Sequence, residues 1–357
     1  MSDWKAFPDV RSPFGRTIQD LLVRRPRLQP MPGFDEVYSD FVDYIIRCTH
    51  RIWEEKDIGL CRTHYGPDCV MHTMSGETRG VEAVVQNTIS SLAASSDRQV
   101  IGEDVIWSAD ANDILHSSHR IVSSSTHLGD DGMLGPATRR QAGVMTIADC
   151  ACRENRIVEE WLVRDNMRAV EQVGLNGWSV AQELAKSDAE GDPARHAWRA
   201  AELSRIRRSG DVATDPDHPA APLVAMLRLA LREDLYGQAA ACLSPAVEIR
   251  WPTNRHGFGR GFWIGCWTQI RAALHAPALS IDHVAARPLP GDDIAVAIRW
   301  SLAGVHGGGG IWGPPTGRDL AILAVSHYRV RAGLVIEDAT VFDELSILRQ
   351  IAGGLGG

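Results

Sequence analysis

The stretch Gly313-Pro314-Pro315-Thr316-Gly317-Arg318 lies between His306 and Asp343, and a second version, Gly135-Pro136-Ala137-Thr138-Arg139-Arg140, lies between His127 and Asp165. Each histidine follows an arginine by seven residues, Arg299 in one copy and Arg120 in the other. The last arginine of each stretch precedes its aspartate by 25 residues, and one residue deleted before Gly-Pro aligns the two copies. Chance rarely preserves such a frame. The sequence therefore predicts a duplicated domain.

Length and composition agree with two globular domains. The chain has 357 residues, of which 44% are hydrophobic and 23% charged. It has no apolar run approaching the roughly 18 residues of a membrane span, and its first residues lack the pattern of a signal peptide. The net charge of -8 argues against nucleic acid as a partner. Seven cysteines without a paired spacing favour a reduced, cytoplasmic setting. We therefore expect no nucleic-acid partner and no membrane contact.

Turn-rich and proline-rich segments divide the chain into five parts. Prolines in residues 1–34 predict an N-terminal arm. Residues 35–175 form the first repeat, 176–220 a helical connector and 221–352 the second repeat, and the glycine-rich 353–357 is a tail.

Both repeats show the same order of elements. Apolar residues at helical spacing come first, with Phe41, Tyr44 and Ile45 in one copy and Leu223, Met226 and Leu227 in the other. Four strand-like runs end each repeat, and in the second they are 281–286, 294–302, 320–330 and 334–341. Helices followed by a run of antiparallel strands predict an α+β fold, with helices packed on the concave side of one curved sheet.

Several short motifs resemble one known family. The second repeat has Arg299-Trp300, His306-Gly307, the Pro-Thr-Gly turn, Val335-Ile336-Glu337 and Asp343, and the first has His127, Ile157-Val158-Glu159 and Asp165. This pattern resembles the SnoaL-like polyketide cyclases of the nuclear transport factor 2-like superfamily. The resemblance implies two cone-shaped α+β barrels in tandem. It also implies an intra-chain pseudo-dimer, because single-domain members usually pair through their sheets, and it leaves further homodimerisation open.

The predicted chemistry centres on the two aspartates. Asp165 shares one face of its strand with Glu159, Trp161 and Val163, and we expect that face to point into the cone. A buried carboxylate with a raised pKa suits proton transfer next to a carbonyl group. The resemblance implies that Asp165 and Asp343 act as acid and base, with His127 and His306 beside them. It implies no metal and no cofactor.

The predicted ligand is a small apolar carbonyl or ester compound. Candidate substrate-binding residues are the arginines and tryptophans near the motifs: Arg120, Arg299, Trp161, Trp251, Trp300 and Trp312. The second repeat has the fuller turn and more tryptophans, so we expect it to hold the working pocket. These predictions point to a polyketide cyclase-like aldol cyclisation, an isomerisation or a related lyase step.

Simpler interpretations remain open for every one of these residues. The aspartates would cap the ends of strands, the histidines would satisfy backbone groups in the turns, the arginines would form structural ion pairs and the tryptophans would fill a core. His72, His116, His119 and His127 lack the spacing of a zinc site. Two further functions stay as alternatives: water addition of the epoxide-hydrolase type, and a non-catalytic small-molecule binding protein.

Overall fold

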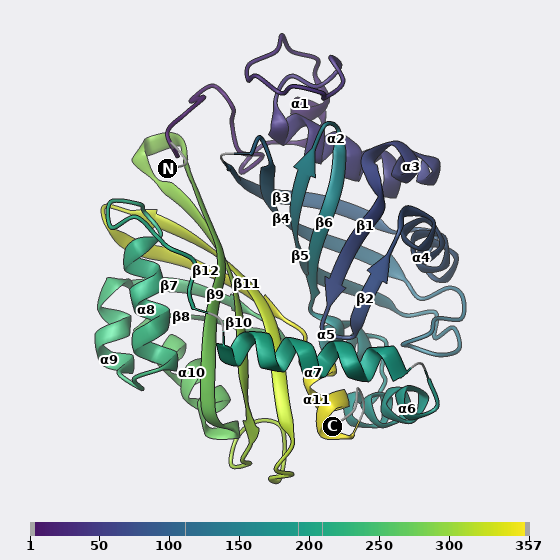
Figure 1. The fold of residues 1–357 in the computed structure, drawn as a ribbon, viewed down its shortest axis with the longest axis vertical. Coiled ribbons are helices and arrows are strands. Elements are labelled where there is room, and N and C mark those ends of the chain that lie inside the picture. Colours follow the sequence, from purple (N-terminus) through teal and green to yellow (C-terminus); the bar gives the residue numbers. More distant parts are fainter. Residues whose placement is uncertain (1–3, 111, 192, 209, 354–357) are drawn as a thin grey trace.

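Each repeat of the sequence folds into one six-stranded sheet with its own helices (Figure 1). The computed structural model describes residues 4–110, 112–191, 193–208 and 210–353. The strand order is β2-β1-β6-β5-β4-β3 in the first domain and β8-β7-β12-β11-β10-β9 in the second. The predicted fold, two α+β domains in tandem, is confirmed. Most of the predicted tail, 354–357, lies outside the described residues.

The strands of the first domain are β1 (Tyr65–Thr73), β2 (Gly76–Arg79), β3 (Gln99–Ala109), β4 (Leu115–Thr126), β5 (Gln141–Arg153) and β6 (Arg156–Arg164). Those of the second are β7 (Leu243–Trp251), β8 (Arg255–Phe258), β9 (Leu274–Pro288), β10 (Ile294–His306), β11 (Asp319–Arg331) and β12 (Leu334–Phe342). The last four strands of each domain form the expected antiparallel meander. Each sheet is nevertheless mixed, because β1 pairs with β6 and β7 with β12 in parallel.

The helices before the meander are α2 (Phe41–Trp53), η1 (Ile58–Leu60), α3 (Cys61–His64) and α4 (Val81–Ala94) in the first domain, and α8 (Ala221–Leu231), α9 (Tyr236–Ala239), η2 (Ala240–Cys242) and α10 (Arg260–Ala273) in the second. A short η3 (Pro290–Asp292) joins β9 to β10. The predicted amphipathic helices are α2 and α8, and each buries its apolar face. Helix α1 (Ile18–Leu22) lies in the N-terminal arm.

Helices α4 and α10 fix the alignment of the repeats. Gly80 and Gly259 precede them with φ of 83° and 88°, a left-handed conformation that favours glycine. Both helices have 14 residues, so each α10 residue carries the number of its α4 counterpart plus 179. On the strands before and after the helix, β1 and β6, the offset is 178, as the registers of β1 with β6 and of β7 with β12 require.

The connector contains α6 (Gly177–Ala189) and α7 (Pro193–Arg208), after α5 (Asn166–Gln172), which ends the first domain. Helix α7 runs across both domains and contacts β2 of the first and β9, β10 and β11 of the second (Figure 1). The last helix, α11 (Glu344–Ile351), packs on α6. The connector thus binds the two domains to each other as well as joining them in sequence.

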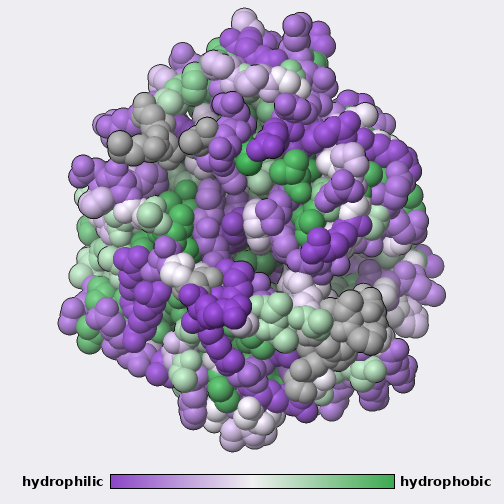
Figure 2. Space-filling view, viewed as in Figure 1, coloured by the Kyte–Doolittle hydropathy of each residue, from purple (hydrophilic) through white to green (hydrophobic). Residues whose placement is uncertain are grey.

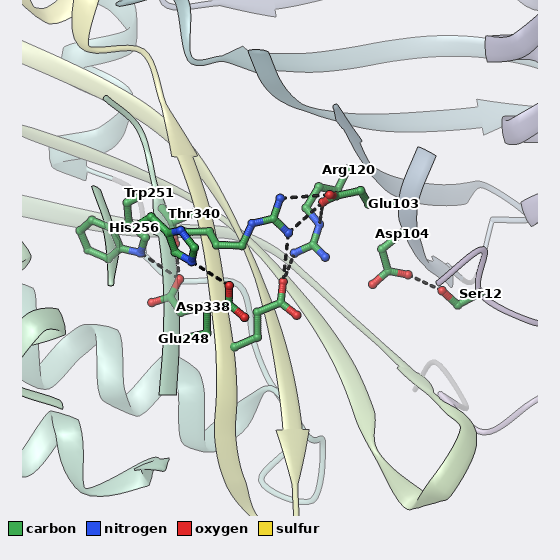
Figure 3. A network of polar contacts seen from close by, with 11 residues as sticks. Ser12, Glu103, Asp104, Arg120, Glu248, Trp251, His256, Asp338 and Thr340 are labelled. Atoms are coloured by element: carbon green, nitrogen blue, oxygen red, sulfur yellow. Dashed lines mark hydrogen bonds and ion pairs between the residues drawn. The ribbon is translucent and has the colours of Figure 1, made fainter. Parts of the chain in front are cut away.

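The two sheets also contact each other directly. Arg120 on β4 forms an ion pair with Glu103 at 3.0 Å (Figure 3) and another with Glu337 of the other domain at 2.9 Å. Ser118 is hydrogen-bonded to His327 across the interface at 2.9 Å. Almost every residue of β10 is buried, because one face of the strand meets its own helices and the other meets the first domain. This double burial explains the nearly continuous apolar run from Ile294 to Leu302.

The face of the molecule seen in Figure 1 is mainly hydrophilic, with hydrophobic residues in several separate groups (Figure 2). Within the described ranges, no helix combines the length and the hydropathy needed to cross a membrane.

Candidate functional site

A cavity of about 540 Å³ occupies the interior of the first domain. Its walls come from α2, α4 and strands β1, β4, β5 and β6. Because side chains alternate along a strand, β6 contributes Glu160, Leu162 and Arg164 to the wall. The opposite face of β6 meets the second domain, where Val163 packs in a core shared with β10, β11 and β12. The prediction that the face of Glu159, Trp161 and Val163 points into the cone is therefore wrong by one residue.

Glu160 is the buried carboxylate of this cavity. Its side chain accepts a hydrogen bond from the Tyr65 hydroxyl at 3.1 Å, and Tyr65 is its only hydrogen-bond partner within the described part of the chain. Burial raises the pKa of Glu160, while Tyr65 and the charge of Arg164 lower it less strongly. Burial also raises the pKa of Tyr65, so its hydroxyl stays a donor. The cavity thus contains a carboxyl group that takes up a proton more readily than an exposed one.

Arg164 and His119 add a cation and a neutral ring to the same cavity. Among the described residues, the Arg164 guanidinium has neither a hydrogen bond nor an ion-pair partner. His119 on β4 lies 3.4 Å from Thr49 through Nδ1, and its buried Nε2 has no partner in the described chain. Burial lowers the pKa of His119 to about 3, so the ring is uncharged at neutral pH. A Cβ on Gly102 would lie 2.7 Å from this Nε2, so a glycine is needed there.

The interior of the second domain is filled by tryptophans at the equivalent positions. Thr73, Val84, Thr88 and Ile121 line the first cavity, and their counterparts are Trp251, Trp263, Trp267 and Trp300. All four indoles are buried, and Trp267 contacts the other three at ring-centroid distances of 4.7 to 5.9 Å. The second repeat was expected to hold the pocket, but the cavity of about 540 Å³ lies in the first domain, and in the second these tryptophans occupy the equivalent space.

Asp338 is the counterpart of Glu160 in the second domain. It accepts hydrogen bonds from Trp251 at 3.1 Å and Thr340 at 2.6 Å (Figure 3). It also accepts one from Trp263 at 2.9 Å. Burial raises its pKa to about 6 despite these three donors. The carboxylate position is therefore present in both domains, but in the second it is enclosed by side-chain donors.

The predicted catalytic aspartates lie at the junction of the domains, as N-caps of helices. Asp165 caps α5 and accepts from the backbone N–H of Arg168 at 3.2 Å and of Thr253 at 2.9 Å. Asp343 caps α11 and accepts from Asn166 Nδ2 at 2.7 Å. Burial raises the pKa of Asp165 to about 7 and also raises that of Asp343. Both carboxylates therefore have assigned structural partners.

Asp343 also lines a smaller cavity of about 170 Å³ beside the main one. The two cavities share five wall residues, among them Arg164 and Asn166. A carboxylate of the second domain thus lies next to the site of the first.

The predicted histidines are hydrogen-bonded to the Gly-Pro turns, 135–140 and 313–318, of their own repeats. His127 Nδ1 is 3.2 Å from Thr138 Oγ1, and His306 Nδ1 is 3.0 Å from Thr316 Oγ1. The backbone of each histidine also pairs with its turn, to Arg140 in one copy and Arg318 in the other. Among the described residues, neither His127 nor His306 is hydrogen-bonded to Asp165 or Asp343.

The predicted ligand-binding residues are spread over three places. Arg299 pairs with Asp149 at 2.7 Å and stacks over Trp161 at 3.4 Å, and both Arg299 and Trp161 line a cavity of about 500 Å³ between the domains. Burial is the largest single influence and opposes the ionisation of Asp149, but Arg299, His283 and His116 together lower the pKa to about 2. Trp312 donates to Glu344 at 2.9 Å. Arg120 belongs to the interface, and Trp251 and Trp300 to the second core.

Sequence reasoning missed Glu160, Arg164, Tyr65 and His119. The available signal was the alternation of side chains along a strand. Glu160 and Arg164 are sequence neighbours of the predicted residues Trp161 and Asp165, and His119 is the neighbour of Arg120, so all three point to the opposite face. The inner face of β6 could be chosen only with the knowledge that the sheet of the second domain covers its opposite face.

Comparison with protein-family models finds no match, and comparison with curated proteins finds none either. Solved structures similar to this chain include IdmH from Streptomyces antibioticus, a candidate polyketide cyclase. The two sequences are 24% identical, the match covers 38% of this chain and 98% of IdmH, and the TM-score is 0.32. A candidate SnoaL-like polyketide cyclase from Jannaschia sp. CCS1 matches at 18% identity, 39% and 98% coverage and a TM-score of 0.31. AclR from Streptomyces galilaeus, a candidate hydroxylase, matches at 18% identity, 37% and 92% coverage and a TM-score of 0.32.

SnoaL-like polyketide cyclases are thus among the structural neighbours, as the sequence motifs predict. Each covers about two fifths of this chain.

Proposed function

We propose that this chain is a cofactor-independent enzyme whose first domain transfers a proton on a small, largely apolar carbonyl or ester compound. The observation that carries the proposal is Glu160: a buried carboxyl group with a single hydrogen bond, facing a cavity of about 540 Å³. Aldol cyclisation and isomerisation both begin with removal of a proton next to a carbonyl, and a carboxylate with a raised pKa performs that step and returns the proton.

In this mechanism Glu160 takes the proton from carbon and Arg164 stabilises the enolate oxygen that forms. Tyr65 holds the Glu160 side chain in one orientation at 3.1 Å. The guanidinium of Arg164 supports the second role, because it lines the cavity, has no carboxylate partner among the described residues and stabilises developing negative charge there. Asp165 and Asp343 are assigned to capping α5 and α11, where backbone donors already bind them.

The test is hydrogen–deuterium exchange at the α-carbon of 2-tetralone in D2O, followed by proton NMR. We expect the wild-type chain to accelerate exchange and Glu160→Gln to lose at least ~100-fold of that acceleration, the usual scale for a general acid–base. Asp338→Asn is the matched control, since it changes the equivalent carboxylate of the other domain, and it should keep the activity. Undiminished exchange in Glu160→Gln would rule out the proposed mechanism. A chain that binds ketones tightly without accelerating exchange would be the non-catalytic binding protein.

Water addition to an epoxide is a second candidate, favoured by one observation. Arg164 lines both the main cavity with Glu160 and the adjoining one with Asp343, so two carboxylates and an arginine meet there. Diol formation from styrene oxide that requires both Glu160 and Asp343 would support this reaction over proton transfer.

We also propose that the packing of the two sheets takes the place of a dimer interface, making the chain a pseudo-dimer. The ion pairs of Arg120 with Glu337 and of Arg299 with Asp149 support this role. Sedimentation of the full chain tests for a further homodimer. The cytoplasmic location stays a prediction.

A further inference from the structure

Two arginines in the first cavity lack carboxylate partners. Arg164 has no polar partner among the described residues, and Arg98 donates to the neutral Ser91 hydroxyl at 2.7 Å. The Nε atom of Arg98 is buried without a partner. Its guanidinium lies over the ring of Trp53 at 5.3 Å from the centroid. Both arginines, Ser91 and Trp53 line the same cavity.

Among the described residues, the acidic side chains of the cavity wall form no ion pair with Arg98 or Arg164, and one of them, Asp130, is exposed. Asp131 accepts from the backbone N–H groups of Met133 and Leu134 at 2.7 and 3.0 Å. Glu160 is held by Tyr65, and Glu77 pairs with His72 at 3.0 Å on the other side of β1. In the part of the chain that the structure describes, no carboxylate lies within ion-pair distance of Arg98 or Arg164.

A partly buried cation without an anionic partner raises the free energy of the empty protein, and a bound anion reduces that cost. Burial lowers the pKa of Arg98 to about 10, which still leaves it charged at neutral pH. Two further groups in the wall have unused hydrogen-bonding capacity: Ser117 Oγ and His119 Nε2 have no partners among the described residues, and these residues are 0% and 2% exposed. The wall is mixed: apolar side chains such as Ile52 and Leu162 alternate with uncharged polar ones such as Thr49 and Asn87.

We propose that the ligand of the first domain is an organic acid, an apolar body carrying a carboxylate that pairs with Arg98 and Arg164. The guanidinium of Arg164 has five N–H donors, so it binds this carboxylate and the enolate oxygen through different N–H groups. The planar guanidinium matches the two oxygens of a carboxylate. The apolar body lies against Trp53 and the aliphatic wall. This inference rests on the proposed function and narrows its substrate to a carbonyl compound that also bears an acid group.

Calorimetry with three probes of similar shape tests the inference: 2-naphthoate, the uncharged 2-naphthamide and 2-naphthyl phosphate. We expect the wild-type chain to bind 2-naphthoate at least ~10-fold more tightly than 2-naphthamide, the scale of one charge-assisted pair. Equal affinity for acid and amide would overturn the proposal, and so would tighter binding of the phosphate. These wild-type measurements need no variant to fold.

Variants then locate the anion. Arg164→Met and Arg98→Met should each weaken 2-naphthoate binding at least ~10-fold and leave 2-naphthamide unchanged. Arg62→Met is the control, because Arg62 is exposed and pairs with Glu82 at 2.7 Å outside the cavity. An unchanged acid preference in both cavity variants would also overturn the inference. Exchange on the neutral 2-tetralone is a separate readout, so the acid preference and the Glu160 mechanism fail independently.

Discussion

The two domains share one fold and one carboxylate position, yet their interiors differ in what surrounds that carboxylate. In the first domain Glu160 has one hydrogen-bond donor and faces open space. In the second, Asp338 has three donors, two of them indoles that also fill the cone. The difference teaches that a few large side chains decide whether the same backbone encloses a cavity or a filled core.

The interface side of the sheets shows why both domains persist. Arg120 and Arg299 occupy equivalent positions on β4 and β10, and each makes an ion pair to the opposite domain. Neither sheet is exposed on that face, so losing either domain would uncover apolar strands. The first domain therefore contains the cavity, and the second stabilises the first by covering the outer face of its sheet.

The largest effect should come from emptying the filled cone. Trp267 contacts three other tryptophans, and Trp267→Ala should lower the free energy of unfolding by about 3–5 kcal/mol, the usual cost of removing a buried aromatic side chain. Urea denaturation measures it. Trp178→Ala is the control, because that indole is 41% exposed. A similar small loss in both variants would contradict the assignment of these tryptophans to the core.

The next largest effect is on the pH dependence of stability, which should differ between the two capping aspartates, Asp165 and Asp343. Asp165 has a folded pKa of about 7, raised mainly by burial, so the folded state binds a proton that the unfolded state loses near pH 4. Stability therefore falls as pH rises from about 4 to 7, by at most about 4 kcal/mol for this group. Asp165→Asn should flatten that slope in urea titrations across the window.

Asp343 provides the contrast, because four donors bind it and two bind Asp165. We expect Asp343→Asn to flatten the slope less, with the exposed Asp130→Asn as a neutral control. Parallel curves for wild type and Asp165→Asn would show that Asp165 does not titrate in this range.

The sequence predicted the fold well because duplication and periodicity are local signals. The meander strands, the helices α2 and α8 and the frame from Arg120 to Asp165 could all be read from spacing. The site was harder, because it depends on which face of β6 looks inward. Burial on both faces makes the strand ambiguous, and Asp165 stands one residue beyond its end, where it caps a helix.

The tryptophans of the second repeat posed a related problem. Trp251 and Trp300 mark the inner face correctly, but an aromatic wall and an aromatic filling look alike in one sequence. Only the comparison with Thr73 and Ile121, small enough to leave space, separates the two.

A smaller effect should follow from changing the enclosed carboxylate. Asp338→Asn replaces one acceptor oxygen by an NH2 group, which leaves at least one of the three surrounding donors without an acceptor. We expect a loss of about 1–3 kcal/mol in the free energy of unfolding at pH 7. Glu160→Gln should lose less, because only Tyr65 binds that side chain and burial already penalises its charge. An equal loss in both would mean that Glu160 is structural.

The smallest effect, and the most direct test of the comparison, is to copy one tryptophan into the open cone. Thr88 on α4 corresponds to Trp267 on α10, and both side chains are buried. Thr88→Trp should place an indole in the cavity and weaken binding of 2-naphthoate at least ~10-fold, about 1.4 kcal/mol. Because the cavity already provides room, the cost in stability should stay at the lower end of the 1–3 kcal/mol typical of overpacking. Thr88→Val, which keeps the size of the side chain, is the control and should bind normally. Unchanged binding in Thr88→Trp would place the ligand elsewhere, and the cavity between the domains would then be the site to probe.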